Sequence, residues 1–164
     1  MNDPMTILKA DHREAKKLLN QLSDSDEGKQ RDDTANELAA ALTLHMDLEE
    51  RLVYPLVRQH IGREDEEEAE VEHRLAREGL TKMLSMTDVP GFGAAVEMLL
   101  GGIEHHVKEE ESELLPELKQ AMERSDWLAL GDAIAKAKAD AGMPVKPSSP
   151  ARRSSKRKKA ASRN

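Results

Sequence analysis

Two stretches of the chain share one pattern: HMDLEERLVYP at residues 45–55 and HVKEEESELLP at residues 106–116. In each stretch a His is followed four residues later by a Glu and ten residues later by a Pro, and the two copies lie 61 residues apart. Residues i and i+4 lie on one face of an α-helix, so each His and its Glu can point to the same place. The pattern therefore predicts two related helices, each carrying a His–Glu pair.

A second pair of His residues repeats with the same offset. His12 lies in the segment Asp11-His12-Arg13 and His73 in Glu72-His73-Arg74, each 33 residues before the His of a longer motif. Each half of the chain thus contains a His and then His-x-x-x-Glu. A two-metal site built by two related helix pairs would need such a set.

The composition favours helices and excludes several chemistries. Aromatic residues make up only 2% of the 164 residues, whereas Ala, Leu, Glu, Lys and Met dominate, and these residues form helices well. The sequence has no Cys, which excludes disulfides, thiolate nucleophiles and iron–sulfur ligands. No apolar run reaches the length of a membrane span, and no signal-peptide core is recognisable at the N-terminus. We expect a cytoplasmic protein without membrane contact.

Apolar residues recur every three or four positions through most of the chain, which predicts an all-α fold. The expected helices are an up-down four-helix bundle, with a short fifth C-terminal helix that covers one end of it. Pro55 and Pro116 fall inside the second and fourth helices and should kink them or end a segment. The expected ranges are about residues 4–22, 31–60, 63–83, 92–123 and 127–141.

The four His and two Glu all fall on the apolar stripes of the four long helices. Buried carboxylates without partners would cost several kcal/mol each, and no Lys or Arg shares those stripes. Nitrogen and oxygen donors without sulfur suit iron, manganese or zinc. If each Glu bridged two ions joined by an oxo or hydroxo group, each ion would be five-coordinate with an open position. The predicted metal ligands are His12, His45, Glu49, His73, His106 and Glu110.

This doubled pattern resembles the hemerythrin-like, or HHE cation-binding, family over about residues 5–125. The resemblance implies a non-haem di-iron centre with two Fe ions per chain, held by the six residues just named. Oxygen-carrying hemerythrins have a further His four residues after the third one, and Arg77 stands there in this sequence. The six-residue set is closer to the family's stress-related branch. That branch includes proteins linked to repair of iron–sulfur clusters, which usually carry a Cys-bearing domain.

Several neighbouring residues leave alternatives open. His105-x-x-x-Glu109 also fits the short motif, although the ten-residue distance to Pro116 favours His106. Glu50 and Glu111 are expected to be outer groups around the site, with a ligand swap as the alternative. We expect Tyr54 to pack, with gating or hydrogen bonding near the site as the alternative.

The C-terminal end differs from the rest. Eight basic and no acidic residues follow from Lys146 onward, so the first 145 residues carry a net charge of −15 within a total of −7. We expect one bundle domain, residues 1–143, and a disordered Lys/Arg-rich tail, residues 144–164. The tail could bind nucleic acid non-specifically, or it could simply keep the chain soluble.

The six ligands, together with what the resemblance implies, predict a di-iron protein that binds or reacts with O2, NO or peroxide in an oxidative or nitrosative stress response. One alternative is an enzyme with catalase-like or peroxidase-like turnover. Another is an iron-handling or regulatory module whose tail docks on DNA. We expect a monomer or a weak oligomer.

Overall fold

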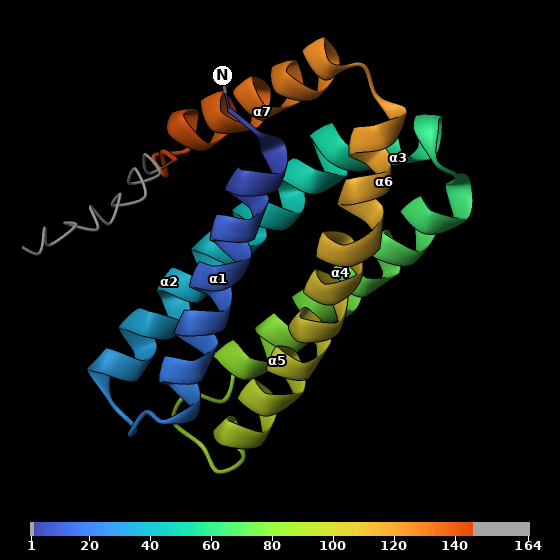
Figure 1. Ribbon diagram of the computed structural model, residues 1–164. Coiled ribbons are helices and arrows are strands. Elements are labelled where there is room, and N and C mark those ends of the chain that lie inside the picture. The colour runs from blue at the N-terminus through green and yellow to red at the C-terminus, as the bar shows by residue number, and fades with distance from the viewer. Residues whose placement is uncertain (1, 146–164) are drawn as a thin grey trace, which may run out of the picture.

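The computed structural model describes residues 2–145. Within this range the chain is helical and contains no strand, which confirms the predicted fold class (Figure 1). The predicted tail falls almost wholly outside the described residues. None of the helices within residues 2–145 has an apolar stretch long enough to cross a bilayer.

Four long helical rods form the bundle, and two of the rods are each built from three consecutive segments. The first rod is α1 (Pro4–Ser23) and the third is α4 (Arg63–Leu84). The second consists of α2 (Lys29–Leu48), the π-helical segment η1 (Glu49–Val53) and α3 (Tyr54–His60). The fourth consists of α5 (Phe92–Glu109), the π-helical segment η2 (Glu110–Leu114) and α6 (Leu115–Ala121).

The last helix, α7 (Arg124–Asp140), runs across one end of the bundle beside the N-terminus (Figure 1). It packs mainly against α1 and also contacts α2 and η1. Gly131 lets it approach the N-terminal segment, because a Cβ built there would lie 1.9 Å from the backbone oxygen of Asn2. This helix is the predicted cover over the bundle.

The two π-helical segments explain how the rods pass their prolines. A proline lacks an N–H and its ring collides with the carbonyl group four residues earlier, so an ordinary α-turn is disfavoured. Here one wider turn precedes each proline: the N–H of Tyr54 bonds to the oxygen of Glu49, and that of Leu115 to the oxygen of Glu110. The sequence predicted a kink or a segment end at Pro55 and Pro116, and the structure shows a π-helical turn before each of them.

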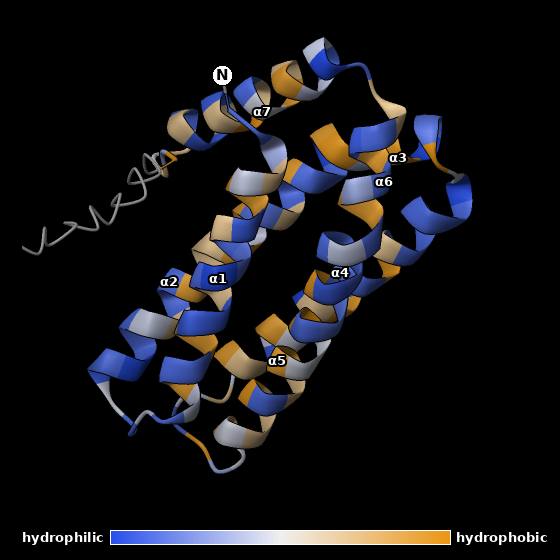
Figure 2. Ribbon diagram, viewed as in Figure 1, coloured by the Kyte–Doolittle hydropathy of each residue, from blue (hydrophilic) through white to orange (hydrophobic). Residues whose placement is uncertain are grey.

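The buried apolar side chains of the bundle form two clusters. Figure 2 shows hydrophobic and hydrophilic residues interspersed along the helices that supply them. One cluster fills the half that contains Leu19, Leu38 and Val96. The other lies beneath α7 and contains Leu8, Leu118 and Ile134. A layer of polar side chains separates the two clusters, and it contains the predicted ligands.

Candidate metal centre

Each of the four rods contributes one of the predicted His residues to the polar layer. His12 lies on α1, His45 on α2, His73 on α4 and His106 on α5. Glu49 and Glu110 are the first residues of the two π-helical segments. All six side chains are buried, with exposed fractions of 5% or less. The structure thus brings together every residue that the sequence selected.

Two of the His rings meet tip to tip beside both carboxylates. Nε2 of His12 and Nε2 of His45 lie 3.1 Å apart. The Glu49 Oε2 atom is 3.1 Å from His45 Nε2, and the Glu110 Oε2 atom is 3.3 Å from His12 Nε2. Donor atoms about 2.1 Å from one ion and at right angles to each other lie about 3 Å apart. These four residues therefore have the spacing of ligands around one metal ion.

A second group repeats this arrangement on the other side of Glu49. Nε2 of His73 and Nε2 of His106 lie 3.2 Å apart. Glu49 Oε2 is 3.3 Å from His73 Nε2, and Glu110 Oε2 is 3.6 Å from His106 Nε2. Each carboxylate thus faces a His from both groups. Such a donor set suits two ions that share the Glu residues.

The carboxylate oxygens lack the partners that burial normally demands. Neither oxygen of Glu49 accepts a hydrogen bond, although the side chain is 0% exposed, and Glu110 Oε2 accepts none either. Buried polar atoms are almost always bonded, because an unpartnered carboxylate loses its hydration without compensation. Metal ions between the His tips and these oxygens would remove the penalty. The residues present therefore fit a dinuclear metal centre.

A carboxylate faces the outward nitrogen of each His ring, in four cross-helix pairs. Carboxylates only accept hydrogen bonds, so a bonded Nδ1 carries the proton and Nε2 keeps its lone pair free for a metal. The Nδ1–H groups of His12, His73 and His106 donate to Glu111 (2.9 Å), Glu50 (2.9 Å) and Glu72 (2.8 Å), while His45 Nδ1 lies 3.6 Å from Asp11. The 61-residue offset also relates these pairs: His12 with Glu111 corresponds to His73 with Glu50, and His45 with Asp11 to His106 with Glu72. The two-fold repeat therefore includes the carboxylates around the site. Glu50 and Glu111 are among them, as the sequence indicated.

The electrostatics of the metal-free site favour positive charge between the His rings and the carboxylates. Burial alone would lower the pKa of His45, but the Glu49 carboxylate, with Asp11 and Glu110 nearby, raises it to about 10. Burial would raise the pKa of Glu49, yet the facing His45, His73 and His12 rings hold it well below its usual range. A proton on His45 thus partly balances the buried carboxylates. A metal ion could take over this role and displace the proton.

Tyr54 lies in the site, where the hydrogen-bonding alternative holds instead of the packing role that we favoured from the sequence. Its hydroxyl group is 2.8 Å from His73 Nε2 and donates to Glu110 Oε1 at 3.3 Å. The side chain is 0% exposed, and burial together with the Glu110 and Glu49 carboxylates raises the pKa of Tyr54 well above its usual value. The hydroxyl is therefore a neutral hydrogen-bond donor beside the second group of ligands.

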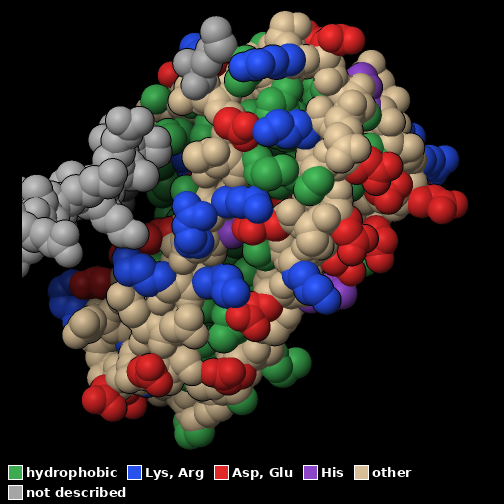
Figure 3. Space-filling model, in the orientation of Figure 1, with side chains coloured by type: hydrophobic (Ala, Val, Ile, Leu, Met, Phe, Trp, Pro, Cys, Tyr) green, Lys and Arg blue, Asp and Glu red, His purple; other side chains and the backbone are tan. Residues whose placement is uncertain are grey.

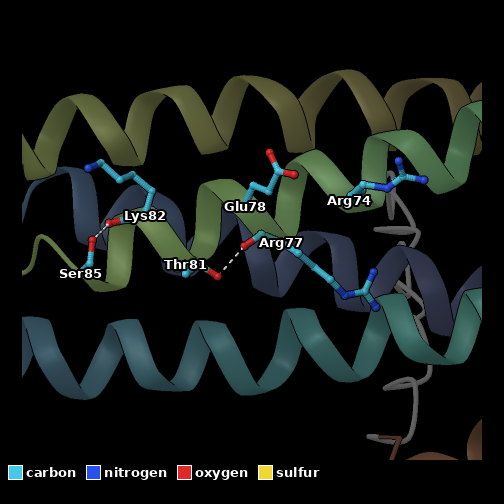
Figure 4. Close-up of a pocket in the computed structure, with 6 residues that line it drawn as sticks. All are labelled: Arg74, Arg77, Glu78, Thr81, Lys82 and Ser85. Carbon is cyan, nitrogen blue, oxygen red and sulfur yellow. Dashed lines mark hydrogen bonds between the residues drawn. The ribbon is translucent and has the colours of Figure 1, made fainter.

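Arg77, at the position of the extra His of oxygen carriers, turns outward from the centre. It donates to Glu50 Oε1 at 2.5 Å and to Asp47 Oδ1 at 2.7 Å, and thereby holds Glu50 against His73. Figure 4 shows its guanidinium group reaching from α4 toward the neighbouring helix. Arg77 also lines a shallow pocket of about 480 Å³ along α4. This residue supports the site from outside.

The other His residues of the chain lie at the surface. His105 is 62% exposed and contacts Glu72 and Glu109 rather than the centre. His60 is exposed at the end of α3. The structure therefore places His106, and not its neighbour, in the buried layer.

Comparison with known proteins agrees with this geometry. The hemerythrin HHE cation binding domain matches residues 3–118. An uncharacterized hemerythrin-like protein of Schizosaccharomyces pombe is 30% identical over 107 residues, which cover 63% of this chain and 53% of that protein. The chain thus spans about half the length of this curated relative, and no solved structure matches it. The chain belongs to the hemerythrin HHE cation-binding family.

Proposed function

We propose that this protein is a non-haem di-iron protein that binds or reacts with O2, NO or peroxide. One observation carries the proposal: the fully buried Glu49 carboxylate has no hydrogen bond and faces Nε2 atoms from both His groups. The family's metal-binding character supports the same interpretation. His12 and His45 would hold one iron and His73 and His106 the other, with Glu49 and Glu110 shared between the two ions and an oxo or hydroxo group joining them.

The ligand count leaves room for a small molecule. When bound, iron supplies a redox-active Lewis acid with an open coordination position. Around it, the two apolar clusters bury the His and Glu side chains within the bundle. The Glu50, Glu72 and Glu111 carboxylates fix the orientation of three His rings. A role in oxidative or nitrosative stress is consistent with such a centre.

Catalase-like or peroxidase-like turnover at the same centre is the alternative. The Tyr54 hydroxyl favours it, because it places an O–H donor within 3.3 Å of Glu110 and next to His73. Peroxide chemistry requires protons to be delivered at the site. Sustained peroxide loss would support the enzyme, whereas reversible optical changes with O2 or NO would support a binding protein.

A DNA-docking role of residues 146–164 predicts that deleting them abolishes function without changing the metal spectrum.

Metal analysis combined with an optical spectrum tests the proposal. We expect two irons per chain and near-ultraviolet charge-transfer bands. The double variant His45→Ala/His106→Ala should lose the metal and these bands, whereas His60→Ala, at an exposed His, should keep both. Circular dichroism shows whether the double variant stays helical. Fewer than one transition metal per chain after aerobic expression with iron would refute the proposal.

A further inference from the structure

A small groove lined by carboxylates runs from the surface to the candidate metal centre. It encloses about 140 Å³ between α4 and the rod formed by α5, η2 and α6. We call it the acidic groove. Its carboxylates come from both walls: Asp65, Glu68 and Glu72 on α4, and Glu109, Glu113 and Glu117 opposite. Figure 3 shows acidic side chains gathered on this side of the molecule.

The inner end of the acidic groove is one of the candidate iron ligands. Glu110 lines the groove, is 1% exposed, and its Oε2 atom accepts no hydrogen bond. None of the described residues that line the groove is Lys or Arg. Like charges at this density repel one another unless a cation lies among them. The unpartnered oxygen of Glu110 shows where such a cation would be bound.

A second group of metal-binding residue types lies beside the groove. Donor atoms of Glu72, His105 and Glu109 lie within 4.8 Å of one another. His105 Nε2 is 3.3 Å from Glu72 Oε1 and 3.4 Å from Glu109 Oε1. The other oxygen of Glu72 accepts from His106 Nδ1, so this outer group touches the inner centre directly. Its oxygen and nitrogen donors suit Fe²⁺.

The groove positions can be compared with the equivalent positions of the first half of the chain, which repeats the same helix pattern. Shifting the numbers back by 61 residues replaces five groove carboxylates by Pro4, Ile7, Leu48, Leu52 and Leu56. His105 corresponds to Leu44 in the same way.

These apolar positions of the first half lie beneath α7. Ile7 and Leu48 pack in one cluster with Ile134 of that helix. Asp11, the counterpart of Glu72, is closed off by Lys138, whose Nζ lies 2.6 Å from its Oδ2. The corresponding positions of the first half are therefore packed without carboxylates. The first-half positions are apolar and covered by α7, whereas the equivalent second-half positions line the open acidic groove.

We propose that the acidic groove is the route by which Fe²⁺ reaches the dinuclear centre. The field of the carboxylates draws the ion in, the group of Glu72, His105 and Glu109 holds it next, and Glu110 receives it. A cleft lined by charge of one sign raises the rate of capture of an opposite charge about 10- to 1,000-fold. This inference rests on the proposed di-iron function, but concerns the rate of loading and not the final metal content.

The test measures how fast the metal-free, full-length protein takes up Fe²⁺ without oxygen, with a colorimetric chelator added at set times to capture unbound ions. The groove variant is Glu68→Gln/Glu113→Gln/Glu117→Gln. The control, with the same change in net charge at exposed positions outside the groove, is Glu37→Gln/Glu70→Gln/Glu78→Gln. At low ionic strength we expect the groove variant to load about tenfold more slowly and the control within about twofold of the parent. The difference should shrink in high salt.

A third variant tests the outer group without changing any carboxylate. His105→Leu copies the residue found at Leu44, and it should slow loading while the iron content stays at two per chain. Loading at the parental rate would overturn the role of this group.

Equal loading rates of the groove variant and the control would overturn the entry route itself. If the parent protein took up no iron, the proposed function would fail instead, so the two failures are distinguishable. Thermal unfolding of each metal-free variant shows whether its bundle remains intact.

Discussion

The close packing of α7 against the N-terminal segment predicts that a Gly→Ala substitution has opposite effects on the free energy of unfolding at two sites. At Gly131, a new Cβ would lie 1.9 Å from the Asn2 backbone oxygen and 2.9 Å from Pro4 Cδ. No real contact is this short, so the N-terminal segment must move away from α7. At Gly101 on α5 no heavy atom lies within 4 Å of a built Cβ. Gly101→Ala is therefore the matched control.

The expected magnitude follows from three contributions. Overpacking costs about 1–3 kcal/mol. Displacing Asn2 also endangers its two hydrogen bonds to Asp132 Oδ1, at 3.1 and 2.9 Å, each worth about 0.5–1.5 kcal/mol at most. Replacing Gly by Ala inside a helix regains about 1 kcal/mol. We expect Gly131→Ala to lower the free energy of unfolding by about 1–3 kcal/mol, and Gly101→Ala to raise it by up to about 1 kcal/mol.

Chemical and thermal unfolding of the metal-free variants measure both effects. For a chain of this size, the loss at Gly131 corresponds to a fall in melting temperature of about 3–10 °C. Hydrogen exchange should also show faster opening of α7 amides in Gly131→Ala. If Gly131→Ala stabilised the protein as much as Gly101→Ala does, the N-terminal segment would not lie against α7 as described. The covering of the first-half counterparts of the acidic groove by α7 would then be contradicted as well.

Two further predictions concern the groups around the metal centre. Glu50→Ala and Glu111→Ala each remove the carboxylate that orients a His ring, and should weaken iron binding about 10- to 100-fold in chelator competition. The control Glu104→Ala, at an exposed carboxylate, should leave iron affinity unchanged. Equal iron affinity in all three variants would contradict the orienting role. Tyr54→Phe should destabilise the metal-free protein by about 1–3 kcal/mol, because it removes the buried O–H donor that His73 Nε2 and Glu110 Oε1 share there. The iron-loaded protein should lose less stability, since iron would then occupy His73 Nε2; an equal loss in both forms would show that the hydroxyl does not share ligands with the metal.

Much of the fold could be predicted because its signals are local. Helical periodicity located the long rods, and the first helix begins at Pro4 as expected, with Asp3 Oδ1 accepting from the Thr6 N–H. The 61-residue repeat selected the six residues that the structure brings into one buried layer. Repeated spacing is informative here because equal helix positions in related halves meet at the same depth of a bundle.

Tyr54 shows where this reasoning stops. Counted along an α-helix from Glu49, the next residues on the same face are three, four and seven positions later, which omits Tyr54. The π-helical segment adds one residue to that turn, so the Tyr54 N–H bonds to the oxygen of Glu49 and the side chain joins the site. The form of this turn is not readable from α-helical periodicity.

The sequence by itself determined the all-α fold and the set of His and Glu residues that share the bundle core, because both depend on spacing along single helices. Only the tertiary structure decided which carboxylate supports which His, since those partners come from different helices, as with His12 and Glu111. It also decided what the acidic residues between 64 and 72 lie against. Packing of α4 against the last part of the fourth rod turns these residues into one wall of the acidic groove that ends at Glu110.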